Sequence, residues 1–203
     1  VAAGTLFLGE PLGATLAEIR VTGVGAIYQG ALARRLVQAS AQAGGPIEAE
    51  ALRQATPRLA TPLVLRAGRD DLAFLPPPAD GGLAAAVAFN VLARHPADVQ
   101  GALDASLAAV ARWRQQGGSA EALIAAPPAG GPSLPALPAS TSYVVLDRDG
   151  MAAGCAMTMN NLFGTGRIAP GTGLLLAASP AAVPPPLLAA GIAYNTSLRA
   201  FRA

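Results

Sequence analysis

The sequence contains few of the residues that most catalytic and metal sites require. Among its 203 residues there is one cysteine, Cys155, and one histidine, His95. A lone cysteine excludes an internal disulfide and a cysteine-rich metal cluster, and a lone histidine argues against a histidine metal site or a Ser-His-Asp triad. We therefore expect no metal and no cofactor. A hydrolase built on this chain would need a base other than histidine.

Charge and long apolar runs are also scarce. Lysine is missing altogether, so all 14 basic residues are arginines, and the formal net charge is only +2. The arginines are scattered and form no basic stripe with aromatic residues, which argues against a nucleic-acid partner. No apolar run reaches the ~18 residues that a membrane-spanning helix needs, and no signal peptide is visible. With 52% apolar residues the chain can still bury a sizeable core.

Apolar periodicity predicts mainly helices in the first two thirds of the chain. The expected helices cover residues 16–43, 45–55, 82–94, 96–116 and 119–124, with Ser119 as a cap for the last. Residues 61–75, "TPLVLRAGRDDLAFL", read as a hairpin around a Gly/Asp turn. Helices first and strands later favour an α+β layered fold.

A linker rich in proline and glycine, residues 127–139, divides the chain into a region 1–126 and a β region 140–203. After it, two apolar runs flank an Asp-Gly turn, which predicts a second hairpin. The first run, "TSYVVLD", is apolar on both faces, so we expect it to be buried from both sides. The later segment "LLLAASP" reads as a short buried strand.

Three segments occur in a telling order, namely "IYQGALARRLVQASAQAGGPIEAEALRQATP", "FLPPPADGG" and "STSYVVLDRDGMAAGCAMTMNNLFGTGRIAPGTGLLL". Together they resemble the gamma-glutamyltranspeptidase family, and the similarity runs with gaps from Ile27 to Leu176. The "PPP-x-x-GG" and "T-x-N-x-x-FG-x-G" elements are fairly specific together, although either alone is weak. By this resemblance, residues 1–126 are similar to the family's large subunit and residues 140–203 to its small subunit.

The resemblance implies a partial four-layer αββα sandwich of the N-terminal-nucleophile hydrolase class. Such a precursor cuts itself at the linker, and the new N-terminal hydroxyl residue becomes the nucleophile with its own α-amine as the base. That chemistry suits a chain with one histidine, because a hydroxyl is a weak nucleophile until a base lies beside it. The implied substrate is a γ-glutamyl or other small-molecule amide, and the implied location is exported or periplasmic.

Position by position, Ser140 falls on the nucleophile of these relatives and Thr141 on the following threonine. A slip of one residue would make Thr141 the nucleophile instead. Thr158 falls on the threonine that hydrogen-bonds the nucleophile, Asn160 on a substrate contact, and Gly164 on the glycine-rich loop beside the substrate. From the residues alone, Ser140 and Thr141 are also compatible with the ordinary start of a strand after a linker.

The chain departs from the family where relatives hold the substrate's α-amine. The segment "LLLAASPAAV" has neither the carboxylate nor the amide that the family carries there, and Ser replaces Thr at the nucleophile. These departures favour an alternative, a catalytically degenerate relative that serves as a structural or accessory subunit with protein partners. In a third hypothesis, other chains supply the missing part of the site.

Overall fold

The computed structural model describes residues 4–5, 9–131, 133–198 and 200–201. The chain forms two compact units, each built from segments that are distant in sequence. Unit 1 contains Val1–Leu59 and Phe163–Ala178, and unit 2 contains Ala60–Leu162 and Ser179–Ala203. The predicted division of the chain at residues 127–139 is a site of cleavage. The compact units do not test whether the chain is cut there, so this division stays a prediction.

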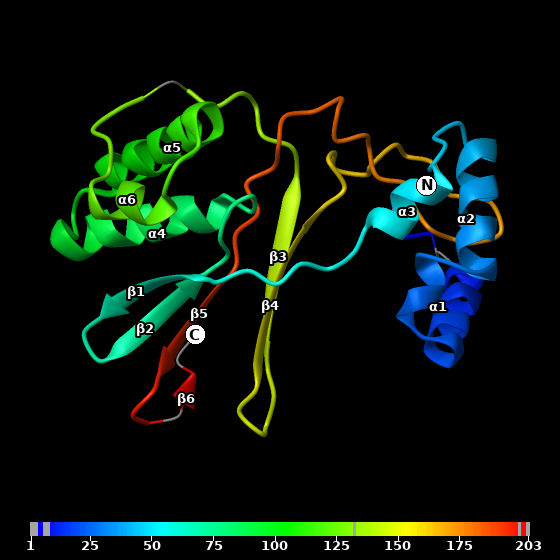
Figure 1. Cartoon of the computed structure of the whole chain (residues 1–203), viewed down its shortest axis with the longest axis horizontal. Helices are drawn as coiled ribbons and strands as arrows, with labels where there is room; N and C mark the ends of the chain where they lie inside the picture. The colour runs from blue at the N-terminus through cyan, green and yellow to red at the C-terminus, as the bar shows by residue number, and fades with distance from the viewer. Residues whose placement is uncertain (1–3, 6–8, 132, 199, 202–203) are drawn as a thin grey trace. The chain divides into compact units, whose positions relative to one another are not determined.

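Unit 1 is mainly helical (Figure 1). Its elements are α1 (Glu10–Thr22), the 3-10 helix η1 (Val24–Ile27), α2 (Ala31–Gln42) and α3 (Ala49–Gln54). The prediction of one helix over 16–43 was therefore wrong, because the chain breaks at Gly23 and Gly30. These two residues have φ angles of 86° and 93°, which interrupt a right-handed helix and which glycine adopts at little cost.

The segment 163–178 completes unit 1 as a loop. Its residues Ala169 and Leu176 are buried with Leu36 and Ala39 of α2. The predicted strand "LLLAASP" was wrong, since only one isolated bridge, Ile168 with Leu175, forms there. Gly171 and Gly173 have φ angles of 70° and 68°, so the backbone turns where an extended strand would need to continue.

Unit 2 combines a four-stranded sheet, a separate hairpin and three helices. The strands are β1 (Leu63–Ala67), β2 (Asp70–Phe74), β3 (Ser140–Leu146), β4 (Ala152–Thr158), β5 (Gly191–Asn195) and β6 (Ala200–Phe201), and the helices are α4 (Gly81–Arg94), α5 (Val99–Gln116) and α6 (Ala120–Ala125). The sheet has the antiparallel order β1-β2-β5-β6, and β3 pairs with β4. Both predicted hairpins are confirmed, and the mixture of helices with antiparallel sheets confirms the α+β class.

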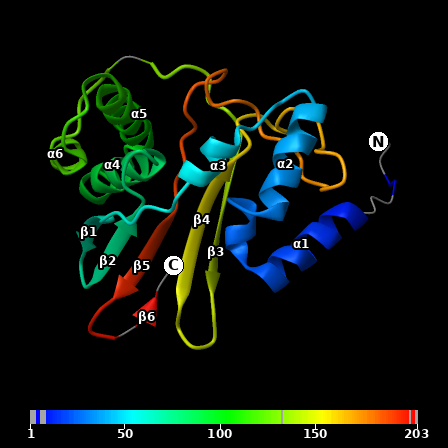
Figure 2. The same ribbon diagram turned by 45° about the vertical axis from the view of Figure 1, so that its right-hand side comes forward.

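The core of unit 2 lies between its helices and the first hairpin (Figure 2). Leu83 and Val87 of α4 and Val110 of α5 are fully buried, and Leu63 of β1 packs into the same cluster.

Ser119 caps α6 as predicted, since its hydroxyl accepts from the Ala122 N–H. Helix α5 begins at Val99, after the cap Asp98, rather than at residue 96. No helix among the described residues has the length and hydropathy required to cross a membrane.

The β3–β4 hairpin carries an exposed strand. Every residue of β3 is exposed, including Tyr143, Val144 and Leu146, so the prediction that this run is buried from both sides was wrong. The physical reason is that β3 pairs with β4 along one edge, and no further strand pairs with it among the described residues. Strand β4 contacts β5 near Gly154, where an added Cβ would lie 3.4 Å from the Ala190 methyl carbon.

Candidate functional site at the start of β3

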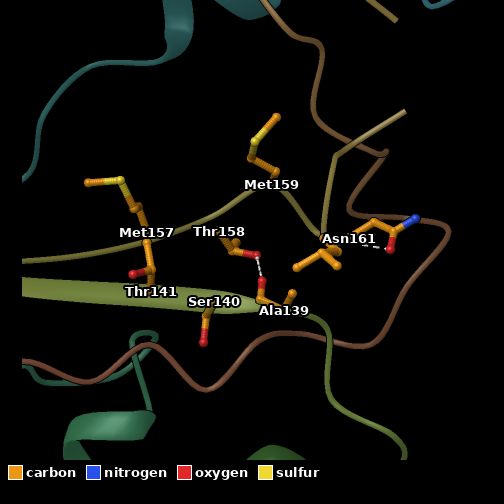
Figure 3. Close-up of a pocket in the computed structure, with 8 residues that line it drawn as sticks. Ala139, Ser140, Thr141, Met157, Thr158, Met159 and Asn161 are labelled. Atoms are coloured by element: carbon orange, nitrogen blue, oxygen red, sulfur yellow. Dashed lines mark hydrogen bonds between the residues drawn. The ribbon is translucent and has the colours of Figure 1, made fainter. Parts of the chain in front are cut away.

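The two hydroxyl residues at the linker end lie on opposite faces of one strand. The linker ends at Ala139, β3 begins at Ser140, and the antiparallel register places Ser140 opposite Thr158 and Thr141 opposite Met157. Because successive side chains of a strand alternate, the Ser140 and Thr141 hydroxyls point in opposite directions (Figure 3). The structure therefore brings Ser140 and Thr158 together as a cross-strand pair.

The Thr158 hydroxyl is oriented by two backbone groups. It donates a hydrogen bond to the Ala139 carbonyl oxygen at 2.5 Å, and its oxygen accepts from the Asn160 N–H at 2.8 Å. Since an N–H can only donate and a carbonyl can only accept, the Thr158 proton must lie on the Ala139 side. A neutral donor is thus aimed at the carbonyl of the Ala139–Ser140 peptide bond, as Figure 3 shows.

The two predicted substrate contacts lie in different units. Asn160 follows β4 in a left-handed conformation, with a φ of 59°, which asparagine tolerates better than most residues. Gly164 is buried, has a φ of 54° and belongs to unit 1. Their roles as substrate contacts stay predictions, as do the roles of Ser140, Thr141 and Thr158.

Two cavities in unit 2 flank the junction. The first, of about 250 Å³, is lined by Ala139, Ser140, Thr141, Met157, Thr158, Met159, Asn161 and Leu162. The second, of about 330 Å³, is lined by Ser140, Thr141, Ser142, Leu187, Leu188 and Ala189. Sequence reasoning missed Met157, Met159 and Leu162, although the two methionines are spaced i, i+2, as residues on one face of a strand are.

The wall of the second cavity is held by the "PPPADGG" segment. The Arg114 guanidinium of α5 forms a bidentate pair with the Asp80 carboxylate. Its Nε donates to Oδ2 at 2.7 Å and its Nη2 donates to Oδ1 at 3.1 Å. The same Nη2 also donates to the Pro185 carbonyl at 3.0 Å, just before the wall residues. At Gly81, an added Cβ would lie only 2.5 Å from the Leu188 carbonyl carbon. This close approach explains why glycine follows Asp80.

The electrostatics of the site are those of neutral groups. Among the described residues, neither cavity is lined by an Asp, Glu, Arg or His side chain, and no cluster of three potential metal ligands is found. The nearest perturbed group on the hairpin is Tyr143, whose pKa is raised by its hydrogen bond to Cys155 and by repulsion from the thiolate form of that residue. The site can therefore offer hydroxyls, an amide and apolar surface, but no fixed charge.

The fold of this chain is similar to that of a solved structure. Among solved structures, the chain is similar to cephalosporin acylase from Bacillus halodurans, with 18% sequence identity and a TM-score of 0.72 over 96% of this chain and 43% of that chain. The chain thus spans less than half the length of that protein. At this identity the likeness shows a shared fold alone. No curated protein matches the sequence.

The family itself is shown by the sequence of the first two thirds of the chain. The model of the family described as gamma-glutamyltranspeptidase matches residues 1–126, which is more than half of the 203 residues. The matched region includes the "PPPADGG" segment that holds the cavity wall. The chain therefore belongs to the gamma-glutamyltranspeptidase family.

Proposed function

We propose that this chain is a gamma-glutamyltransferase-like amide hydrolase or transpeptidase that cuts itself between Ala139 and Ser140. The proposal rests on the family, on the shared fold, and on one observation above all. That observation is the hydrogen bond from the Thr158 hydroxyl to the Ala139 carbonyl oxygen. A donor aimed at a carbonyl stabilises the negative charge that develops on its oxygen when a nucleophile attacks the carbon.

Self-cleavage would proceed through an ester. The Ser140 Oγ attacks the Ala139 carbonyl carbon, the Ala139–Ser140 C–N bond breaks, and the serine proton passes to the departing nitrogen. Water then hydrolyses the ester, which leaves a carboxylate on Ala139 and a free α-amine on Ser140. Thr141 is less well supported as the nucleophile. Its attack would fall on the Ser140 carbonyl, whereas the Thr158 hydroxyl donates its hydrogen bond to the Ala139 carbonyl oxygen.

Turnover would use the two groups that the cut produces. The free α-amine titrates near neutral pH and can accept the proton of the Ser140 hydroxyl, so no histidine is required. The activated oxygen attacks the carbonyl of an amide substrate, and the amine product leaves with the proton. Water or an acceptor amine then takes the acyl group from the Ser140 ester. Asn160 would contact the substrate from the end of β4.

The test is the intact mass of the purified chain, with N-terminal sequencing of every fragment. We expect two fragments, of which the second begins at Ser140. A fragment that begins at Thr141 would move the nucleophile by one residue. A single uncut chain would contradict the proposal, because the amine base would never be released.

Replacing Thr158 with valine should slow self-cleavage by roughly 10²–10³, the usual cost of losing one donor to a developing oxyanion. Valine keeps the shape of threonine and removes only the hydroxyl. A time course of the mass spectrum after expression at low temperature measures the rate. Thr158→Ser is the matched control, since it keeps the hydroxyl and should cleave nearly as fast as the parent. Equal rates for valine and serine would show that the hydroxyl plays no part.

A second candidate function, a catalytically degenerate structural or accessory subunit, is favoured by the exposed β3 strand. Tyr143, Val144 and Val145 are each at least half exposed, and an apolar strand with an open edge is a common docking element. Under this proposal the chain stays uncut and is purified with protein partners. An exported or periplasmic location is also proposed, and it rests on the family resemblance alone.

A further inference from the structure

The acyl-side cavity of the junction is small and apolar. We give this name to the first cavity, of about 250 Å³, whose apolar lining comes from Ala139, Met157, Met159 and Leu162. In Figure 3, Met157 of β4 lies beside Thr141, Met159 follows the end of that strand, and Asn161 lies beyond it. The cavity is open to solvent, since Met157 and Leu162, which line it, are 41% and 69% exposed.

The residue on the acyl side of the proposed cut lines this cavity. Ala139 supplies the carbonyl that Ser140 would attack, and that carbonyl is held by Thr158. An external amide must present its carbonyl carbon to the same oxygen and to the same donor. The group attached to that carbon would then extend from the position of Ala139 into the acyl-side cavity.

No side chain that lines this cavity would give a γ-glutamyl group a charged partner. Of the two charged groups that the cut creates, the Ser140 α-amine acts as the base, and the Ala139 carboxylate must leave the acyl position before an amide binds. The head of a γ-glutamyl group carries an ammonium and a carboxylate, and a charge held away from water requires an oppositely charged or strongly dipolar partner. In the described part of unit 2, the side chains that line both cavities are uncharged. The sequence also carries no acid or amide in "LLLAASPAAV", where relatives hold the substrate's amine.

Building on the function proposed above, we propose that the substrate is an amide of a neutral, apolar acyl group, such as a hexanoyl amide. The acyl chain lies against Met157, Met159 and Leu162, and its carbonyl receives the Thr158 hydrogen bond. Specificity then comes from the apolar area that the acyl chain buries. The γ-glutamyl amides that the family resemblance implies are poor substrates.

The kinetic test uses the self-cleaved full chain and a series of acyl p-nitroanilides that share one leaving group. Burial of one methylene changes kcat/KM by about fourfold, which corresponds to roughly 0.8 kcal/mol. From acetyl to hexanoyl, four methylenes should therefore raise kcat/KM by about 200-fold. We expect γ-glutamyl p-nitroanilide to fall well below hexanoyl. A flat series, or a preference for γ-glutamyl, would overturn the proposal.

Methyl NMR supplies a readout that does not depend on turnover. The chain has three methionines. Met157 and Met159 line the cavity, whereas Met151 lies just before β4 and is 67% exposed. With methyl-labelled methionine, hexanamide should shift the Met157 and Met159 signals and leave Met151 unchanged. Glutamine should shift none of them. No shift with hexanamide, or equal shifts with both amides, would contradict an apolar acyl site.

Two aspartate variants distinguish an effect on the cavity from an effect on the stability of the fold. Met157→Asp places a charge in the cavity and should reduce kcat/KM for the hexanoyl substrate more than tenfold. Met151→Asp adds the same charge to the same hairpin outside the cavity and should leave kcat/KM for the hexanoyl substrate unchanged. Self-cleavage, measured by mass, is the independent check on the proposed function. Shifts of the Met157 and Met159 signals in an uncut chain would contradict the proposed hydrolase but support the apolar acyl site. Self-cleavage without such shifts would support the hydrolase and contradict the acyl site.

Discussion

Ser140→Ala is expected to abolish self-cleavage, so that the variant is recovered as one chain of full mass. The reason is chemical, because alanine has no oxygen that could attack the Ala139 carbonyl. Thr141, the neighbouring hydroxyl, points to the opposite face of β3 (Figure 3). Ser140 is exposed, so the loss of its hydroxyl should not unfold the chain. Mass spectrometry of the purified variant measures the result.

Three companion variants make this prediction specific. Ser140→Thr restores the residue type of the relatives and should cleave. Thr141→Ala and Ser142→Ala remove neighbouring hydroxyls of β3 and should also cleave, at rates within a few-fold of the parent. Cleavage that survives in Ser140→Ala and disappears in Thr141→Ala would assign the nucleophile to Thr141.

Arg114→Ala is expected to lower the free energy of unfolding by about 3–5 kcal/mol, the cost of leaving one member of a buried ion pair alone. The Asp80 side chain is 2% exposed, and it would keep its carboxylate without a cation. The loss would also remove the hydrogen bond to the Pro185 carbonyl. Urea unfolding followed by fluorescence measures the change, because the single tryptophan, Trp113, packs against the core of unit 2.

The matched control is Arg66→Ala, which removes the arginine of another Arg–Asp pair. Arg66 binds Asp71 at 2.8 Å, but its side chain is 59% exposed, so we expect a loss of at most about 1 kcal/mol. The double variant Asp80→Leu with Arg114→Leu should recover much of the stability, because it leaves no buried charge. Equal effects of Arg114→Ala and Arg66→Ala would show that the Asp80–Arg114 pair is not effectively buried.

Local chemistry made several elements predictable. The Gly/Asp turn between two apolar runs predicts the β1–β2 hairpin, and the Asp-Gly turn predicts β3–β4, because such turns need few residues and little help from the rest of the chain. Ser119 caps α6 through a bond three residues away. Gly23 and Gly30 are the sequence signals of the break within residues 16–43, whereas apolar periodicity does not mark it.

The candidate site was predictable only in part. The family motif pointed to Ser140, Thr141, Thr158, Asn160 and Gly164 without showing which backbone groups they touch. The hydrogen bond from Thr158 to the Ala139 carbonyl depends on the register that pairs Ser140 with Thr158. Register is set by two strands together, so neither strand reveals it alone.

By itself, the sequence determined the family and the α+β class, because these depend on residue types and their order. Only the tertiary structure decided that β3 is exposed, that Arg114 reaches Asp80 across 34 residues, and that methionines line the cavity beside Ala139. Burial and contacts between distant segments depend on which surfaces meet in space. Apolar patterning in one segment carries information about that segment's faces and none about what covers them.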